Sequence, residues 1–209
     1  MKLMTPTVKK PALYTVNNIL STVVVVVALY ILAVPFYPII KNFITASKKP
    51  AVPYQGKLAE SLGVTAPNPL PKENKIVIPA AKIDVPIYTG KSLSVIDNGG
   101  SWIKNIWTQD PRDNGNTIII GHRFTYKHPE GAFYNLDKVD VGDRLAVYWE
   151  GDELLYEVTE RKTVGPDQVE VESKTKERIL TIYTCTPLYT ATHRLVIIAK
   201  PVVEGGSRE

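Results

Sequence analysis

The chain has little cysteine and histidine: Cys185 is its one cysteine, and there are three histidines among 209 residues. A single cysteine excludes an intrachain disulfide and is compatible with either side of a membrane. A metal site built from Cys185 and the histidines stays an alternative, but the spacing that marks metal-ligand sets is absent. We therefore expect no metal and no other cofactor.

Acidic residues are absent before Pro50, although six lysines lie there. The remaining chain holds the other 19 of the 25 basic residues and all 21 acidic ones, so its net charge is near −2. The sequence pI of 9.0 thus reflects the N-terminal segment and does not make the rest a nucleic-acid-binding protein. We expect no nucleic-acid partner.

Residues 19–40 form a 22-residue stretch without a charge, including an unbroken valine run from Val23 to Val27. As a helix, this stretch is long enough to cross a bilayer core of roughly 30 Å. A cleavable signal peptide is the alternative. The stretch exceeds the roughly 7–15 apolar residues of such peptides, and no small-x-small cleavage site follows it. The sequence therefore favours an uncleaved transmembrane signal anchor.

The orientation of this anchor does not follow from charge. Lys9 and Lys10 precede the stretch, and Lys41, Lys48 and Lys49 follow it. The positive-inside rule weighs the lysines and arginines close to the membrane, and here the two sides nearly balance.

The chain beyond the anchor divides into a proline-rich linker and a body of short strands. Prolines 50, 53, 67, 69 and 71 indicate a tether over residues 41–74, with a short helix near Leu58 to Leu62. The body lacks a sustained 3.6-residue period, which argues against an α/β enzyme core. Seven or so short strands with turn signals between them predict an all-β barrel or sandwich. The expected strands lie at 76–79, 83–87, 117–120, 144–149, 154–158, 179–184 and 195–199, with a short helix or turn at 131–136.

Cys185 and Arg194 stand at the facing ends of the last two expected strands, Ile179 to Thr184 and Leu195 to Ala199. If these strands pair antiparallel through their short loop, a thiol and a guanidinium meet at one end of a sheet. A lone cysteine is often a small buried hydrophobe. A strand end is, however, where catalytic groups are displayed, and a neighbouring cation favours the nucleophilic thiolate. Arg194 could equally form a surface ion pair of little energetic value.

His122 follows the expected strand 117–120, with Gly121 before it. Taken alone, it could cap a turn. The unperturbed pKa of histidine, about 6.5, suits proton transfer near neutrality, provided that the ring reaches Cys185 or a substrate. His128 in a polar loop and His193 beside Arg194 are expected to be solvated or to support the site.

Three separated motifs resemble those of the sortase family. Thr181 to Cys185 resembles the TLxTC signature, with Ile182 in place of leucine, and Thr192 to Val196 resembles the arginine-bearing strand. Gly121-His122-Arg123 is similar to the histidine site of the family. The resemblance covers about Lys75 to Val202.

The resemblance implies a closed β-barrel with short helices over residues 75–203, preceded by the transmembrane helix. It implies Cys185, His122 and Arg194 as catalytic residues, with Thr184, Thr186 and His193 as substrate-binding or supporting residues. The implied activity is transpeptidation. Cys185 cleaves an LPxTG-like sorting signal through a thioacyl intermediate, and the acyl group passes to an amine acceptor, with hydrolysis as the side reaction.

The resemblance also resolves the orientation. It implies a single-pass protein of the cell membrane, with residues 1–18 cytoplasmic, 19–40 spanning, 41–74 as an extracytoplasmic linker, 75–203 as the catalytic domain and 204–209 as a polar tail. The implied partners are surface proteins that carry a sorting signal and an amine acceptor, either a peptidoglycan precursor or a pilin lysine.

The motifs resemble those of pilin-assembling sortases, and two features depart from them. Such enzymes often carry an N-terminal lid with an Asp-Pro-aromatic motif and a second, C-terminal membrane segment. Here Asp110-Pro111 precedes Arg112 within the body, and the tail is polar. The acceptor therefore stays open between cell wall and pilus assembly. Two other functions remain alternatives: a membrane-tethered binding module with a structural cysteine, and a plain cysteine endopeptidase.

Overall fold

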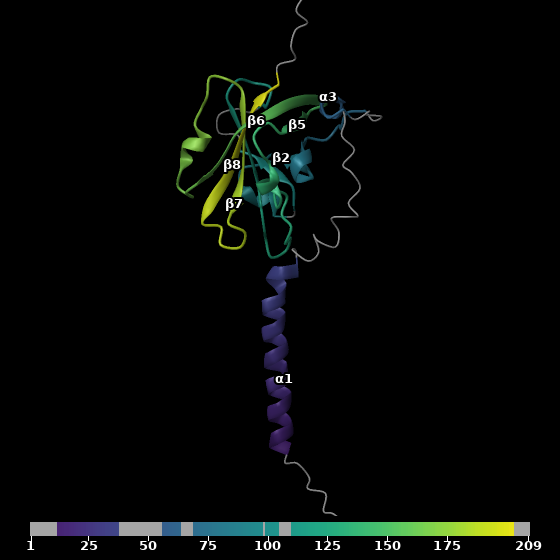
Figure 1. Cartoon of the computed structure of the whole chain (residues 1–209), viewed down its shortest axis with the longest axis vertical. Coiled ribbons are helices and arrows are strands. Elements are labelled where there is room, and N and C mark those ends of the chain that lie inside the picture. The colour runs from purple at the N-terminus through teal and green to yellow at the C-terminus, as the bar shows by residue number, and fades with distance from the viewer. Residues whose placement is uncertain (1–11, 38–55, 64–68, 98, 105–109, 203–209) are drawn as a thin grey trace, which may run out of the picture. The chain divides into compact units, whose positions relative to one another are not determined.

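The computed structural model describes residues 12–37, 56–63, 69–97, 99–104 and 110–202 (Figure 1). The chain divides into two compact units, Met1–Lys49 and Pro50–Glu209.

In the first unit, the described residues form one long helix, α1 (Ala12–Ala33). A single 3₁₀ turn, η1 (Val34–Phe36), follows it. Its stretch Val16–Ala33 is long and apolar enough to cross a membrane, and none of it is buried in the structure. This helix is a candidate membrane anchor, as the sequence predicts. The predicted segment 19–40 overlaps α1 as far as Ala33, and residues 38–40 lie outside the described residues. The α-helix ends ahead of Pro35, because proline has no backbone N–H to continue the α-helical hydrogen bonds.

The second unit is a closed barrel, in which the described residues form eight strands in the order β1-β2-β3-β4-β7-β8-β6-β5. The strands are β1 (Lys75–Ile78), β2 (Ile83–Tyr88), β3 (Ser101–Ile103), β4 (Asn116–Gly121), β5 (Arg144–Trp149), β6 (Asp152–Val164), β7 (Ile179–Thr186) and β8 (His193–Pro201). The short helices are α3 (Gly56–Ser61), η2 (Pro79–Ala81), η3 (Leu93–Ile96), η4 (Leu136–Lys138) and η5 (Val169–Glu172). The predicted all-β barrel is confirmed. Strand β3 was not predicted from the sequence.

Two of the pairings are parallel, β2 with β3 and β4 with β7, and the others are antiparallel. In the β4–β7 pair, Ile118 lies beside Thr181 and Ile120 beside Tyr183. Because parallel strands run in the same direction, β4 and β7 finish at the same rim of the barrel. The antiparallel pair β7–β8 returns from that rim, as predicted for these two segments.

The barrel interior is filled by alternate residues of every strand. Ile119, Ile182 and Ile197 are fully buried there, and Phe133 and Leu136 from the β4–β5 connection pack against them. Burial of one such isoleucine side chain contributes roughly 1.5–3 kcal/mol. Closure of the sheet leaves no unpaired strand edge, which removes a site for aggregation.

Two short helices cover parts of the outer face of the barrel. Leu58 of α3 packs with Val77 and Tyr148, and Glu153 accepts hydrogen bonds from the Lys57 and Leu58 backbone amides at 2.6 and 2.9 Å. On another side, Ile96 of η3 packs on Trp102, Ile118 and Ile120. This outer apolar cluster explains why Ile118 to Ile120 of β4 form a continuous apolar run instead of an alternating one.

Tyr156 generates a pH-dependent prediction. Its side chain is fully buried, and its hydroxyl donates to the Pro111 carbonyl at 3.2 Å. Burial, ahead of smaller effects from Arg178 and Asp110, raises its pKa to about 12. In the unfolded chain a tyrosine ionises near pH 10. Between about pH 10 and 12 the unfolded state therefore releases a proton that the folded state retains, so stability falls as the pH rises.

We expect the wild type to lose up to roughly 2–3 kcal/mol more than Tyr156→Phe between pH 9 and pH 12, measured by chemical denaturation. Tyr126→Phe, at an exposed tyrosine, is the control and should follow the wild type. Parallel stability curves for wild type and Tyr156→Phe would contradict the assignment.

Candidate active site

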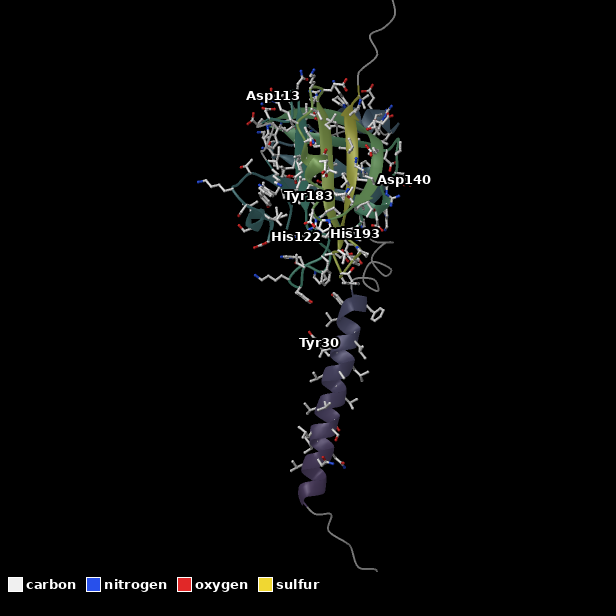
Figure 2. All side chains as sticks on the ribbon, turned by 90° about the vertical axis from the view of Figure 1, so that its left-hand side faces the viewer. Tyr30, Asp113, His122, Asp140, Tyr183 and His193 are labelled. Atoms are coloured by element: carbon white, nitrogen blue, oxygen red, sulfur yellow. The ribbon has the colours of Figure 1, made fainter. Side chains whose placement is uncertain are left out.

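The candidate residues meet at the rim where β4 and β7 end. Within the β7–β8 register, Cys185 lies directly opposite Arg194 and Thr186 opposite His193. His122 comes immediately after β4. Figure 2 shows His122 and His193 near the same end of the barrel, with Asp113, which precedes β4, at the other end. Cys185, His122 and Arg194 all line one cavity of about 260 Å³.

This cavity is a groove on the outer face of the barrel. Its apolar floor crosses three neighbouring strands, because Trp102 pairs with Ile120, and Ile120 with Tyr183. Leu93 of η3 bounds one side. The remaining lining residues are Lys104, His122, Thr184, Cys185 and Arg194.

A charged network lies along one wall of the groove. The Tyr183 hydroxyl donates to Glu172 Oε1 at 2.5 Å, and Lys104 Nζ donates to both Glu172 oxygens at 2.6 and 2.8 Å. Burial, together with the Glu172 hydrogen bond, raises the pKa of Tyr183 above its usual range. The phenol therefore stays neutral and keeps donating near neutral pH. Arg194 and Cys185 have smaller, opposite effects on the same pKa, as expected for neighbouring groups.

Cys185 is half-buried and forms no disulfide. Its position at the end of β7 leaves the thiol on the groove side, in line with Tyr183, because alternate residues of a strand share a face. A thiol that lines a groove beside a guanidinium is suited to nucleophilic attack, which a cysteine enclosed in the core is not.

The imidazole of His122 is held close to the groove by the loop that follows it. The His122 carbonyl accepts the Phe133 amide at 3.0 Å, and a Cβ added to Gly131 would lie 2.2 Å from that same oxygen. Only glycine at 131 permits this close approach. His122 Nε2 is buried and makes no hydrogen bond with the described residues, and Asp97 Oδ1 lies 3.7 Å away. This nitrogen is therefore not committed to a hydrogen bond with the described residues.

Arg194 is oriented by the β7–β8 loop. Its Nη1 donates to the carbonyls of Ala191 and His193 at 3.1 and 3.0 Å. No carboxylate of the described residues forms an ion pair with it, in contrast to the arginines on β5 and β6. Its charge is thus not neutralised by a carboxylate of these residues, and its remaining N–H groups can bind an oxygen of a ligand.

The three predicted supporting residues have different surroundings. Thr184 is only 1% exposed, and its hydroxyl donates to the Gly121 carbonyl at 2.7 Å. Thr186 accepts a hydrogen bond from Arg123 Nη1 at 2.9 Å. His193 is exposed, with its Nδ1 2.9 Å from the Thr192 hydroxyl. Of these three, only Thr184 lines the groove.

Several residues of the site were not identified from the sequence. The pair Lys104–Glu172 joins positions 68 residues apart, so no local pattern indicates it. Trp102 lies in the three-residue strand β3, which is too short to show a period. Arg123 is the exception, because it directly follows His122 in the Gly121-His122-Arg123 motif, so the sequence does place it beside the site.

The acidic residues between η4 and β5 make ion pairs and backbone contacts. Asp137 pairs with Arg123, Asp140 pairs with Arg161, and Asp143 accepts the Asp140 amide. Within the described ranges, no group of three or more His, Cys, Asp or Glu residues is arranged to hold a metal ion.

Comparison with known proteins gives a consistent result. The model of the sortase domain family matches residues 76–202. Sortase SrtE1 of Streptomyces coelicolor is 30% identical over 141 residues, which cover 61% of this chain and 39% of the relative. The matched part thus spans well under half the length of that curated relative.

Solved structures share the barrel. Sortase C1 of Streptococcus agalactiae in complex with MTSET superposes with a TM-score of 0.57 at 27% identity, covering 65% of this chain and 72% of that one. Sortase C of Streptococcus pneumoniae superposes with a TM-score of 0.56 at 26% identity, covering 63% of this chain and 67% of that one. A lid mutant of sortase A of Corynebacterium diphtheriae superposes with a TM-score of 0.58 at 24% identity, covering 68% of this chain and 76% of that one. At this identity the similarity concerns the fold alone.

The sortase C structures bear out the predicted closeness to pilin-type sortases, since one such structure is described as pilus-related. The family match covers more than half of the chain and includes all three candidate catalytic residues. This chain belongs to the sortase family.

Proposed function

We propose that the protein is a membrane-anchored cysteine transpeptidase. It cleaves an LPxTG-like sorting signal between Thr and Gly through a thioacyl intermediate, and it transfers the acyl group to an amine. The observation that carries this proposal is the convergence of Cys185, Arg194 and His122 on one groove. Family membership supports the same reaction class.

In the first half-reaction, the Cys185 thiol passes its proton to His122, and Sγ attacks the carbonyl carbon of the scissile peptide bond. The guanidinium of Arg194 is a permanent cation with N–H groups in a fixed fork, so it stabilises the oxyanion that develops. As the intermediate collapses, the C–N bond breaks and His122 donates a proton to the departing amine. The product is a thioester on Cys185 and a free amine.

In the second half-reaction, the acceptor amine attacks the thioester carbonyl. His122, now neutral, takes a proton from that amine, and the thiolate of Cys185 leaves. One amide is broken, another is formed, and the enzyme returns to its starting state without a cofactor. Water can replace the amine, which gives hydrolysis as the side reaction.

The groove suits a peptide with an aliphatic side chain. Leu93, Trp102 and Ile120 provide an apolar surface next to the nucleophile, as the leucine of such a sorting signal requires. Lys104, which Glu172 holds through two hydrogen bonds, also lines the groove, and its ammonium can donate a hydrogen bond to a peptide carbonyl.

We further propose the topology that the sequence predicts. Helix α1 anchors the protein in the cell membrane as a single span, with residues 1–18 cytoplasmic and the catalytic domain, residues 75–203, outside. Residues 41–74 connect the two. The substrates are then surface proteins that carry a sorting signal. The acceptor is a peptidoglycan precursor amine or a pilin lysine, and the similarity to sortase C structures favours the lysine.

The first test uses the full chain in detergent micelles with a fluorogenic LPxTG-type peptide and either a glycine-based or a lysine-based amine. We expect an amine-linked product from the wild type. The rate at which this product forms should fall by roughly 10³-fold or more in Cys185→Ala and in His122→Ala, because both residues act in the covalent step. His128→Ala is the matched control, as His128 lies in the loop beyond the groove.

Cleavage that persists in Cys185→Ala would contradict the proposal. A product that is free acid at every amine concentration would instead identify an endopeptidase. A wild type that binds sorting peptides without cleaving any of them, and whose Cys185 resists alkylation, would identify a binding module.

Arg194 gives a second prediction. Arg194→Lys keeps the charge but loses the fork, so we expect kcat to fall by about 10²–10³-fold with a smaller change in KM. Arg144→Lys, at an exposed ion pair with Glu157 on β5 and β6, should retain wild-type kcat. If kcat of Arg194→Lys equals that of the wild type, Arg194 does not stabilise the transition state through its fork.

A further inference from the structure

The backbone ladder between β4 and β7 ends before it reaches the catalytic pair. The last paired residues are Ile120 and Tyr183, whereas His122 and Cys185 each lie two positions further along the chain. Two side-chain hydrogen bonds continue the connection beyond the ladder. Thr184 Oγ1 donates to the Gly121 carbonyl at 2.7 Å, and Arg123 Nη1 donates to Thr186 Oγ1 at 2.9 Å.

These two bonds enclose the catalytic pair. Gly121 and Arg123 are the chain neighbours of His122, and Thr184 and Thr186 are the chain neighbours of Cys185. We refer to the Thr184–Gly121 and Arg123–Thr186 hydrogen bonds together as the brace. The brace joins the two segments on both sides of the catalytic residues, so neither segment can move without straining one of the bonds.

Arg123 is itself held firmly. Its Nε donates to the Tyr134 carbonyl at 3.3 Å, and its Nη2 lies 3.1 Å from Asp137 Oδ1. Its side chain is 11% exposed, a position in which a guanidinium is retained only with such partners. Three separate donor atoms are used in three directions, which an ammonium on a flexible stem cannot reproduce. Arg123 does not line the groove, so its contribution does not come from contact with substrate.

We propose that Arg123 is a positioning residue. It fixes Thr186, and through the brace it keeps His122 within proton-transfer reach of the group that Cys185 attacks. The inference rests on the proposed function, in which His122 and Cys185 act together. A displacement of about 1 Å between reacting groups is enough to lower a rate by about 10²-fold.

The kinetic test compares Arg123→Lys, Arg123→Met and Thr186→Val in the full chain in micelles. We expect kcat to fall by about 10- to 100-fold with KM changed by less than about twofold, since the apolar floor of the groove is untouched. The double variant Arg123→Met/Thr186→Val should be no slower than Arg123→Met, because both changes remove the same hydrogen bond.

Arg161 provides the matched control. It donates to the Asp137 carbonyl at 3.0 Å and pairs with Asp140 at 3.1 Å, so it anchors the same η4 region without touching Thr186. Arg161→Met should retain wild-type kcat. Equal losses in Arg161→Met and Arg123→Met would mean that Arg123 only stabilises the loop, which would overturn the proposal.

A second readout needs no sorting peptide, so it remains valid if the proposed reaction is wrong. The alkylation rate of Cys185 by iodoacetamide is measured in the wild type, in His122→Ala, in Arg123→Met and in the double variant His122→Ala/Arg123→Met. We expect His122→Ala to change this rate in the wild type and to have much less effect in the Arg123→Met background. Two results would overturn the proposal. In one, the effect of the double variant on the alkylation rate equals the product of the two single effects to within about twofold; in the other, His122→Ala leaves the alkylation rate of the otherwise wild-type protein unchanged.

Thermal unfolding of each variant shows whether it folds. If Arg123→Met does not fold, Arg123→Lys and Thr186→Val carry both readouts with the same expected outcomes. A wild type that cleaves no sorting peptide, together with coupled alkylation rates, would reject the proposed function while supporting the brace.

Discussion

The parallel pairing of β4 with β7 is the constraint on which the rest of the site depends. Because the two strands run in the same direction and in register, the residues that follow Ile120 and Tyr183 arrive at one rim together. The antiparallel return of β8 then places Arg194 opposite Cys185. An antiparallel β4 would carry His122 to the far end of the barrel. Three residues from separate parts of the chain thus meet through strand direction and register, before any side-chain contact is considered.

Because successive residues of a strand point to opposite faces, the same strands supply both the core and the groove. Ile119 and Ile182 point inward and build the core, while Ile120 and Tyr183 point outward and form the groove floor. Thr184 is enclosed and binds the backbone of the neighbouring strand, and Cys185, the next residue, faces the groove. The stability of the barrel and the chemistry of the groove therefore share strands but use different side chains, so the groove can vary without loss of the core.

The sequence was informative where the signal is local. For the apolar runs 179–184 and 195–199, joined by a short loop, antiparallel pairing would bring Cys185 to Arg194, and the structure has that pair in register. Pattern alone left a barrel and a sandwich open, and the family motifs favoured the barrel. The contact of Lys104 with Glu172 and the partnership of Arg123 with Thr186 join positions 68 and 63 residues apart. Such contacts depend on tertiary pairing, and propensity, periodicity and turn residues carry no information about them.

The proposed reaction depends on one intermediate, in which Cys185 carries the acyl group between the two half-reactions. Its most direct test is the intact mass of the full-length protein, mixed with an LPxTG-type peptide without amine and quenched in acid within seconds. We predict a mass gain equal to the N-terminal peptide fragment that ends in threonine, less one water. The adduct should be located on Cys185 by fragmentation and be lost when amine is added before the quench. An adduct on any other residue, or amine-linked product formed by a protein that never carries the adduct, would contradict it.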